Sequence, residues 1–87
     1  MNKNPEAFRI IGEVSKELGV AQHVLRYWET QFEQLKPIRS GTRRYYRPGD
    51  VELLRAIQRL LYVDGYKIRG VQRMLKELGI KAATAAA

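Results

Sequence analysis

The chain has 87 residues, 45% hydrophobic and 29% charged, which suits one compact domain of ordinary soluble composition. It contains no cysteine and one histidine, so disulfides, thiolate metal sites and a nucleophile–base catalytic set are excluded, and we expect no cofactor and no bound metal. No apolar run suits a membrane span and no secretory leader is present, so we expect a cytoplasmic protein. Sixteen Lys and Arg against nine Asp and Glu give a formal charge of +7 and a pI near 10.1, which suggests a polyanionic partner.

Two short helices joined by a glycine turn are predicted between residues 11 and 34, after a flexible N-terminus (1–7) and a short strand over 7–10. The first helix has its apolar face at Ile11, Val14 and Leu18, and Gly19 stands where a left-handed cap residue belongs. The second helix runs from about 21 to 34, and its buried face is expected to hold Val24, Leu25, Trp28, Phe32 and Leu35. Ser15, four residues before Gly19, is the small residue that a close helix crossing needs, so the pair predicts a helix-turn-helix.

A small β-hairpin is predicted after Pro37, which cannot continue the second helix. Ile38-Arg39 reads as a strand, residues 40–42 (Ser-Gly-Thr) as a turn, and residues 43–46 (Arg-Arg-Tyr-Tyr) as the returning strand. Strand alternation separates Arg43 and Tyr45 from Arg44 and Tyr46, and we expect Tyr46 to pack inward. The hairpin is therefore a basic wing.

Two more helices are predicted in the second half of the chain. Pro48 and Asp50 suit the first turn of the third helix, whose buried stripe is expected at Val51, Leu54, Ile57, Leu60 and Leu61 and whose end is expected at Gly65. The fourth helix is marked by Ile68, Val71, Met74, Leu75 and Leu78 and closed by Gly79. We expect one domain over residues 8–79, followed by an Ala-rich tail or linker over 80–87.

The outward face of the second helix carries side chains suited to reading base edges. Gln22, His23 and Arg26 lie away from the core in its opening turns, the end that enters the major groove in a helix-turn-helix. Arginine pairs with guanine and glutamine with adenine through two hydrogen bonds each. Tyr27, at the edge of the buried arc, is placed to reach a phosphate, although core packing explains it equally well.

The simpler interpretations of these residues stay open at this point. Arg26 is also explained as a solvated helix charge paired with Thr30 or Glu33, and a lone exposed histidine such as His23 is more often a bystander than a base reader. The wing residues Arg39, Arg43, Arg44 and Tyr45 place cations beside the groove of a duplex. Their interleaved arginine and tyrosine also fits single-stranded nucleic acid or RNA bound by stacking, but that mode needs a sheet platform that the sequence lacks.

The order of motifs along the chain resembles the N-terminal DNA-binding domain of MerR-family transcriptional regulators of bacteria. The resemblance spans about residues 8–78 and rests on these segments: Ile11-Gly12-Glu13-Val14, Gly19-Val20, Leu25-Arg26-Tyr27-Trp28-Glu29, Arg44-Tyr45-Tyr46, Asp50-Val51, Gly65-Tyr66 and Ile68. It implies a mainly α, winged helix-turn-helix fold with four helices and a small antiparallel β-hairpin wing. It also implies DNA contacts by Arg26 and Tyr27 on the recognition helix, by Arg44 on the wing, and by Lys67 and Arg69 on a second wing.

Similar proteins bind double-stranded DNA as dimers at inverted repeats and distort a promoter so that RNA polymerase can use it, close to the nucleoid in the cytoplasm. This chain departs from the pattern because the long dimerisation helix and effector domain do not follow. We therefore expect a monomer, or a dimer if a C-terminal helix is missing from a truncated chain. Two helix N-caps that are usually Ser or Thr are Ala21 and Arg47, which costs about 1 kcal/mol each.

Three classes of function compete for this sequence. We expect no enzymatic activity, because the sequence has no paired catalytic groups near His23, its only histidine. Sequence-specific regulation of transcription is the main prediction. A small DNA-architectural protein of the excisionase type is the alternative, because it uses the same helix and wing without an effector domain.

Overall fold

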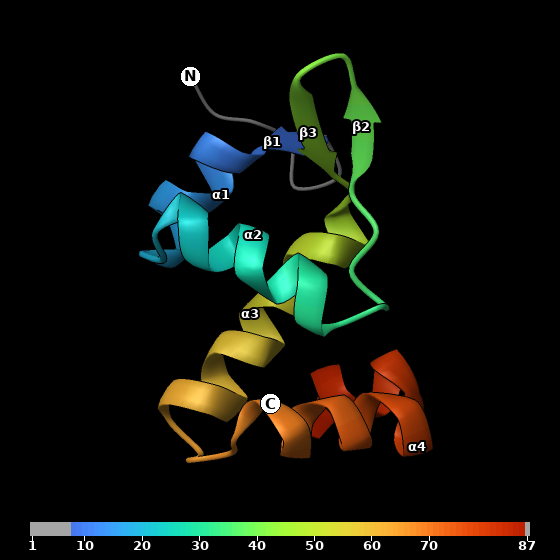
Figure 1. The fold of residues 1–87 in the computed structure, drawn as a ribbon. Helices are drawn as coiled ribbons and strands as arrows, with labels where there is room; N and C mark the ends of the chain where they lie inside the picture. The colour runs from blue at the N-terminus through green and yellow to red at the C-terminus, as the bar shows by residue number, and fades with distance from the viewer. Residues whose placement is uncertain (1–7, 87) are drawn as a thin grey trace.

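The computed structural model describes residues 8–86, which form four helices and a small sheet (Figure 1). The elements in chain order are β1 (Arg9–Ile10), α1 (Ile11–Leu18), α2 (Gln22–Gln31), β2 (Ile38–Ser40), β3 (Arg43–Tyr46), α3 (Pro48–Tyr62) and α4 (Ile68–Ala86). This confirms the predicted mainly α, winged helix-turn-helix fold. The flexible N-terminus predicted for residues 1–7, and the first residue of the strand predicted over 7–10, lie outside the described residues.

The turn between α1 and α2 has the geometry that its sequence predicts. Gly19 caps α1 with φ 68°, in the left-handed region that side chains disfavour. The Ser15 hydroxyl donates a hydrogen bond of 2.6 Å to the carbonyl of Val20, whose amide in turn donates to the Ser15 carbonyl at 3.1 Å. Ser15 thus closes the turn between the two helices.

The second helix is shorter than predicted, because Phe32 is already extended (φ −122°, ψ 103°) and the chain turns at that point. Phe32 and Leu35 are nonetheless buried, 1% and 4% exposed, so the apolar pattern is correct while the helix that carries it ends at Gln31. The amide of Gln72 in α4 donates to the Gln31 carbonyl at 2.7 Å and satisfies one of the acceptors left at this helix end.

The three strands form one antiparallel sheet in the order β1-β3-β2. The β2–β3 hairpin is the predicted wing, with Arg39 opposite Arg44, and Gly41 has a positive φ of 61° in its turn. β1 pairs with the inner edge of β3 and holds the base of the hairpin against α1. Tyr46 is fully buried, as the strand alternation predicts.

The third helix begins where predicted and ends earlier. The Asp50 carboxylate accepts a hydrogen bond of 3.1 Å from the amide of Arg47, the N-cap residue, which supplies a cap interaction that the Arg47 side chain cannot. The helix ends at Tyr62, three residues before Gly65, so the helix end predicted from the sequence is wrong. Gly65 instead turns the α3–α4 loop, with φ 78°, and the Tyr66 amide next to it donates to the Leu60 carbonyl at 2.8 Å.

The fourth helix does not give way to an unstructured tail after Gly79. Gly79 is non-helical (φ 86°, ψ 170°), so it interrupts the helix as predicted, but a helical segment resumes after it and continues to Ala86. Ala83 in this segment is completely buried in the core, whereas Leu78, predicted to face the core, is 65% exposed. Residues 80–86 of the expected Ala-rich tail are therefore helical, and Ala83 packs them against the core. The reason is that Gly79 turns the chain, so a small side chain from the returning segment covers the core where Leu78 does not.

One core joins all four helices to the sheet. Its members are Val14, Leu18, Val20, Leu25, Trp28, Phe32, Leu35, Tyr46, Val51, Leu53, Leu54, Ile57, Leu60, Val71, Leu75 and Ala83. The amide side chain of Gln58 in α3 adds a polar tie by donating to the Leu18 carbonyl at the end of α1, at 2.7 Å. Because the core crosses every helix, α2 and the hairpin are held on one body.

Candidate nucleic-acid interface

The outward face of α2 is open to solvent. Gln22, His23 and Arg26 are all exposed, as the sequence predicts, and Tyr27 is 50% exposed. The guanidinium of Arg26 has no hydrogen bond or ion pair within residues 8–86, and the Thr30 hydroxyl turns back to the Tyr27 carbonyl at 2.6 Å. The interpretation of Arg26 as a charge paired with Thr30 or Glu33 is therefore not observed, and the side chain is available to a ligand.

A single buried carboxylate on α2 holds the hairpin. The Glu29 side chain, only 6% exposed, accepts a hydrogen bond from Arg44 Nε at 3.0 Å and a short one from the Tyr46 hydroxyl. The Arg39 guanidinium on the neighbouring strand lies 3.8 Å from the same carboxylate. Both strands of the wing are thus fastened to the helix that carries Arg26.

This arrangement divides the two adjacent arginines of β3 between different tasks. Arg44 lies on the same side of the strand as Tyr46, so its Nε meets Glu29 and its side chain is only 26% exposed. Arg43 lies on the opposite side and is exposed, and its side chain has no hydrogen bond or ion pair among the residues that the structure describes. Arg39 is 67% exposed and Tyr45 is half-buried. The cations that the hairpin offers most freely are therefore those of Arg39 and Arg43.

The environment of Glu29 perturbs the Tyr46 hydroxyl. Burial is the main cause that raises the pKa of Tyr46 well above its ordinary value of 10.0, and the hydrogen bond to Glu29 and the negative charge of Glu29 raise it further. The phenol consequently stays protonated and keeps donating to the carboxylate. Tyr46 serves as a second fastener of the wing rather than as a ligand-binding group.

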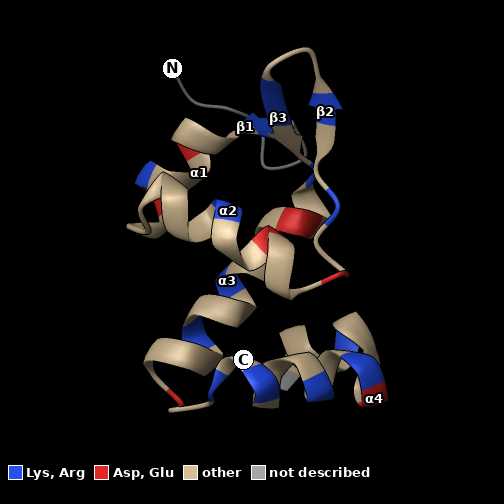
Figure 2. Cartoon of the chain, viewed as in Figure 1, with Lys and Arg blue, Asp and Glu red and all other residues tan. Residues whose placement is uncertain are grey.

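Lys67 and Arg69, the last of the predicted site residues, flank the start of α4. Both are exposed, in and just after the loop that Gly65 turns. Figure 2 shows basic segments on both strands of the hairpin, on α2, and at several places along α3 and α4. The predicted site residues therefore come from three separate parts of the fold.

Glu29 is the important residue that the sequence reasoning left out of the site. It lies three positions after Arg26, about 60° away around the helix, so a charge-patterned wheel places it on the solvated side. A signal was present in the sequence, because the acid-free segment from Leu35 to Pro48 needs a counter-charge nearby and Glu29 is the acid on α2. The burial of Glu29 depends on the hairpin folding over it.

The described part of the chain shows neither a metal-binding cluster nor a membrane-spanning helix. No group of three or more His, Asp or Glu side chains within residues 8–86 converges to hold an ion. No helix in the same range is long and apolar enough to cross a bilayer.

A known protein family matches this chain over the helices and the wing described above. Neither the curated proteins nor the solved structures contain a match to this chain. The family of MerR HTH family regulatory proteins matches residues 10–78, from the strand β1 to the last residue before Gly79. That span includes both helices of the helix-turn-helix, the wing and the start of α4. The chain belongs to the MerR family of helix-turn-helix regulatory proteins, DNA-binding regulators of transcription.

Proposed function

We propose that this chain binds double-stranded DNA sequence-specifically, with α2 in the major groove and the β2–β3 hairpin on the flanking backbone or minor groove. The observation that carries the proposal is the common attachment of the two parts. Gln22 and Arg26 are exposed on α2, and the buried Glu29 on the same helix fastens the wing beside them. A rigid link between a base-reading helix and a cationic ribbon lets both engage one duplex in a fixed register.

Within this interface the residues have different tasks. Arg26 and Gln22 are the base readers, because their donors and acceptors match guanine and adenine edges. The DNA backbone is contacted by the remaining predicted residues, which are Arg39, Arg43, Arg44, Tyr27, Tyr45, Lys67 and Arg69. His23 adds a contact beside Gln22. Arg44 donates to Glu29 through Nε, so its two terminal NH₂ groups can bind a phosphate.

Duplex DNA fits the hairpin better than single-stranded nucleic acid or RNA does. Stacking of bases needs exposed aromatic rings on an open sheet. Tyr46 is fully buried and Tyr45 is half-buried, so the strand does not offer a pair of open rings. Competition between a duplex and its separated strands for the protein tests this choice, and the duplex is expected to compete better.

Replacement of Arg26 tests the proposed base reading. After selection of the preferred site from a random duplex pool, Arg26→Ala is expected to weaken binding to that site by about 1–3 kcal/mol and to relax the preference at one base pair. Arg43→Ala is expected to weaken binding to all duplexes similarly and to reduce the salt dependence by about one phosphate contact. Lys81→Ala, an exposed cation beyond Gly79, is the charge-matched control. An Arg26→Ala protein that keeps the full sequence preference contradicts the proposal.

The regulatory action proposed is distortion of a promoter that RNA polymerase then uses, and it depends on dimers at paired half-sites. The number and spacing of half-sites in the selected sequences report the oligomeric state on DNA. Transcription from a promoter bearing the selected site, with and without the protein, separates this action from a purely architectural one. A change in transcription is expected, and binding without any change favours the architectural alternative.

A further inference from the structure

A groove of about 750 Å³ lies between α3 and the segment of α4 that follows Gly79. The residues of α3 that line it include Arg55, Arg59 and Tyr62, with Val63 beyond the helix end, and the returning segment contributes Lys81 and Thr84. None of the residues that line the groove belongs to the proposed DNA-binding set. The groove exists because Gly79 turns the chain and the buried Ala83 seats the returning segment on the core.

The walls of the groove combine apolar surface with uncompensated positive charge. Tyr62 and Val63 are 62% and 68% exposed and lie side by side in sequence at the end of α3, so the groove has an apolar wall. Arg59 and Lys81 are exposed and have no side-chain partner among residues 8–86. Glu52 is the one acid among the described residues that line the groove.

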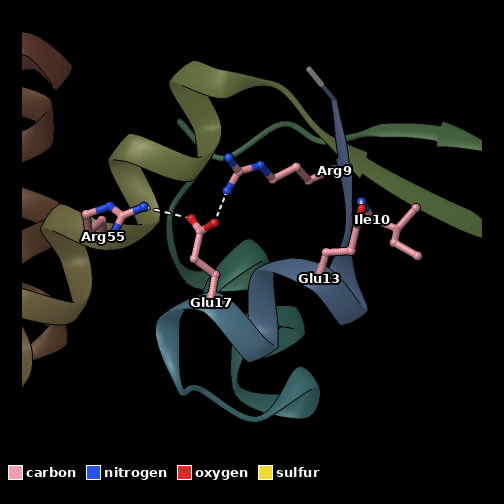
Figure 3. A network of polar contacts seen from close by, with 5 residues as sticks. All are labelled: Arg9, Ile10, Glu13, Glu17 and Arg55. Atoms are coloured by element: carbon pink, nitrogen blue, oxygen red, sulfur yellow. Dashed lines mark hydrogen bonds and ion pairs between the residues drawn. The ribbon is translucent and has the colours of Figure 1, made fainter. Parts of the chain in front are cut away.

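A third cation at the groove is only partly neutralised. Arg55 donates to Glu17 at 2.7 Å and is still 58% exposed, and Arg9 of β1 bonds to the same carboxylate (Figure 3). Figure 3 shows the Glu17 carboxylate lying between the two guanidinium groups. One carboxylate therefore neutralises two guanidinium groups only in part. Arg55 keeps N–H groups that can donate hydrogen bonds to a further carboxylate.

We propose that this groove is a docking site for an acidic amphipathic helix of a partner protein. A helix with apolar residues at i, i+3 or i+4 and i+7 covers Tyr62 and Val63, and its flanking carboxylates pair with Arg55, Arg59 and Lys81. Charge selects this occupant over a second copy of the chain, because a chain of net charge +7 brings mostly like charge to a basic groove. An acidic amphipathic helix also fits the groove better than DNA does, because a phosphate backbone has no apolar surface to pack against Tyr62 and Val63.

The test uses synthetic peptides and the whole chain labelled with ¹⁵N. The probe is an amphipathic helical peptide of about 18 residues, with leucine on one face and glutamate on the other. The comparison peptides carry lysine for every glutamate, or serine for every leucine. We expect the acidic amphipathic peptide to bind and to shift the amide signals of Arg59, Tyr62, Val63, Lys81 and Thr84, and we expect both comparison peptides to bind at least about tenfold more weakly.

Charge reversal in the groove separates this site from general attraction to a basic protein. Arg59→Glu with Lys81→Glu is expected to weaken the acidic peptide at least about tenfold, because like charges then face each other. Lys16→Glu with Lys76→Glu makes the same change in net charge at exposed cations that do not line the groove, and is expected to have little effect. Both double variants alter exposed side chains, and their folding is checked by circular dichroism.

Three results overturn the proposal. The first is that the acidic peptide fails to bind, or binds both double variants equally. The second is that its shifts fall on α2 and the hairpin, which means that it imitates DNA at the other surface. The third is that sedimentation shows a dimer of the chain that the groove variants dissociate, which assigns the groove to a second copy. Duplex binding by the Arg59→Glu, Lys81→Glu protein is measured in parallel, so the two proposals succeed or fail separately.

Discussion

Replacement of Glu29 by glutamine removes the charge that fastens the wing to α2 while it keeps the size and shape of the side chain. In the parent protein the carboxylate is 6% exposed and accepts hydrogen bonds from Arg44 and Tyr46. Glutamine keeps one acceptor oxygen and presents an NH₂ group where the second acceptor stood. The Tyr46 hydroxyl can turn to accept a hydrogen bond from that NH₂ group, but both hydrogen bonds then involve the neutral oxygen or nitrogen atom of an amide in place of a carboxylate, and the arginine loses its counter-charge.

The expected loss follows from these contacts. A hydrogen bond that involves a charged group contributes about 1.5–3 kcal/mol, so Glu29→Gln is expected to lower the free energy of unfolding by about 2 kcal/mol. Glu29→Ala loses both acceptors and leaves a buried hydroxyl and a partly buried cation unpaired, for which about 3–5 kcal/mol is expected. In a domain of this size a loss of 2 kcal/mol corresponds to a fall of about 8–16 °C in Tm.

Urea unfolding and thermal melting followed by circular dichroism measure this effect. Glu33→Gln is the matched control, since Glu33 is exposed just beyond the end of α2 and its replacement is expected to change stability by less than about 0.5 kcal/mol. If Glu29→Gln matches the Glu33→Gln protein in stability, the carboxylate does not hold the wing and the reasoning is refuted.

Three further predictions concern pH, the C-terminal segment and the helix turn. Because the pKa of Tyr46 is raised in the folded state, the folded protein keeps a proton that the unfolded chain releases, so stability is intact below pH 10 and falls above it by up to about 1.4 kcal/mol per pH unit. Urea titrations at pH 8 and above pH 10 should show a smaller loss in Tyr46→Phe, and an equal loss contradicts the assignment. Ala83→Asp is expected to cost about 3 kcal/mol because it buries a carboxylate, whereas Ala85→Asp at an exposed position should cost little, and equal melting temperatures would show that the segment does not pack. Gly19→Ala should lose about 1 kcal/mol because φ is 68°, while Gly49→Ala, inside α3 with open space at its Cβ, should gain about 0.5 kcal/mol; urea midpoints that move in the same direction for both count against the cap.

The sequence alone predicts the parts of this protein that local physics controls. Gly19 ends α1 because only its backbone adopts the left-handed cap readily, and the turn at Gly41 follows from the same property. Helical periodicity places Leu25 and Trp28 inside and Arg26 outside, and the structure confirms all three positions. These outcomes depend on residues within a few positions of one another, so the linear pattern contains them.

The tertiary structure decides what distant residues do to each other. Glu29 is buried only because β3 brings Arg44, fifteen residues later in the chain, against it. A helix wheel considers one helix alone and cannot predict such a contact. Ala83 becomes core only because Gly79 reverses the chain toward α3, although alanine by itself gives no burial signal. Burial of a charge or of a small side chain is set by the neighbour that covers it, and that neighbour is chosen by the packing of the whole domain.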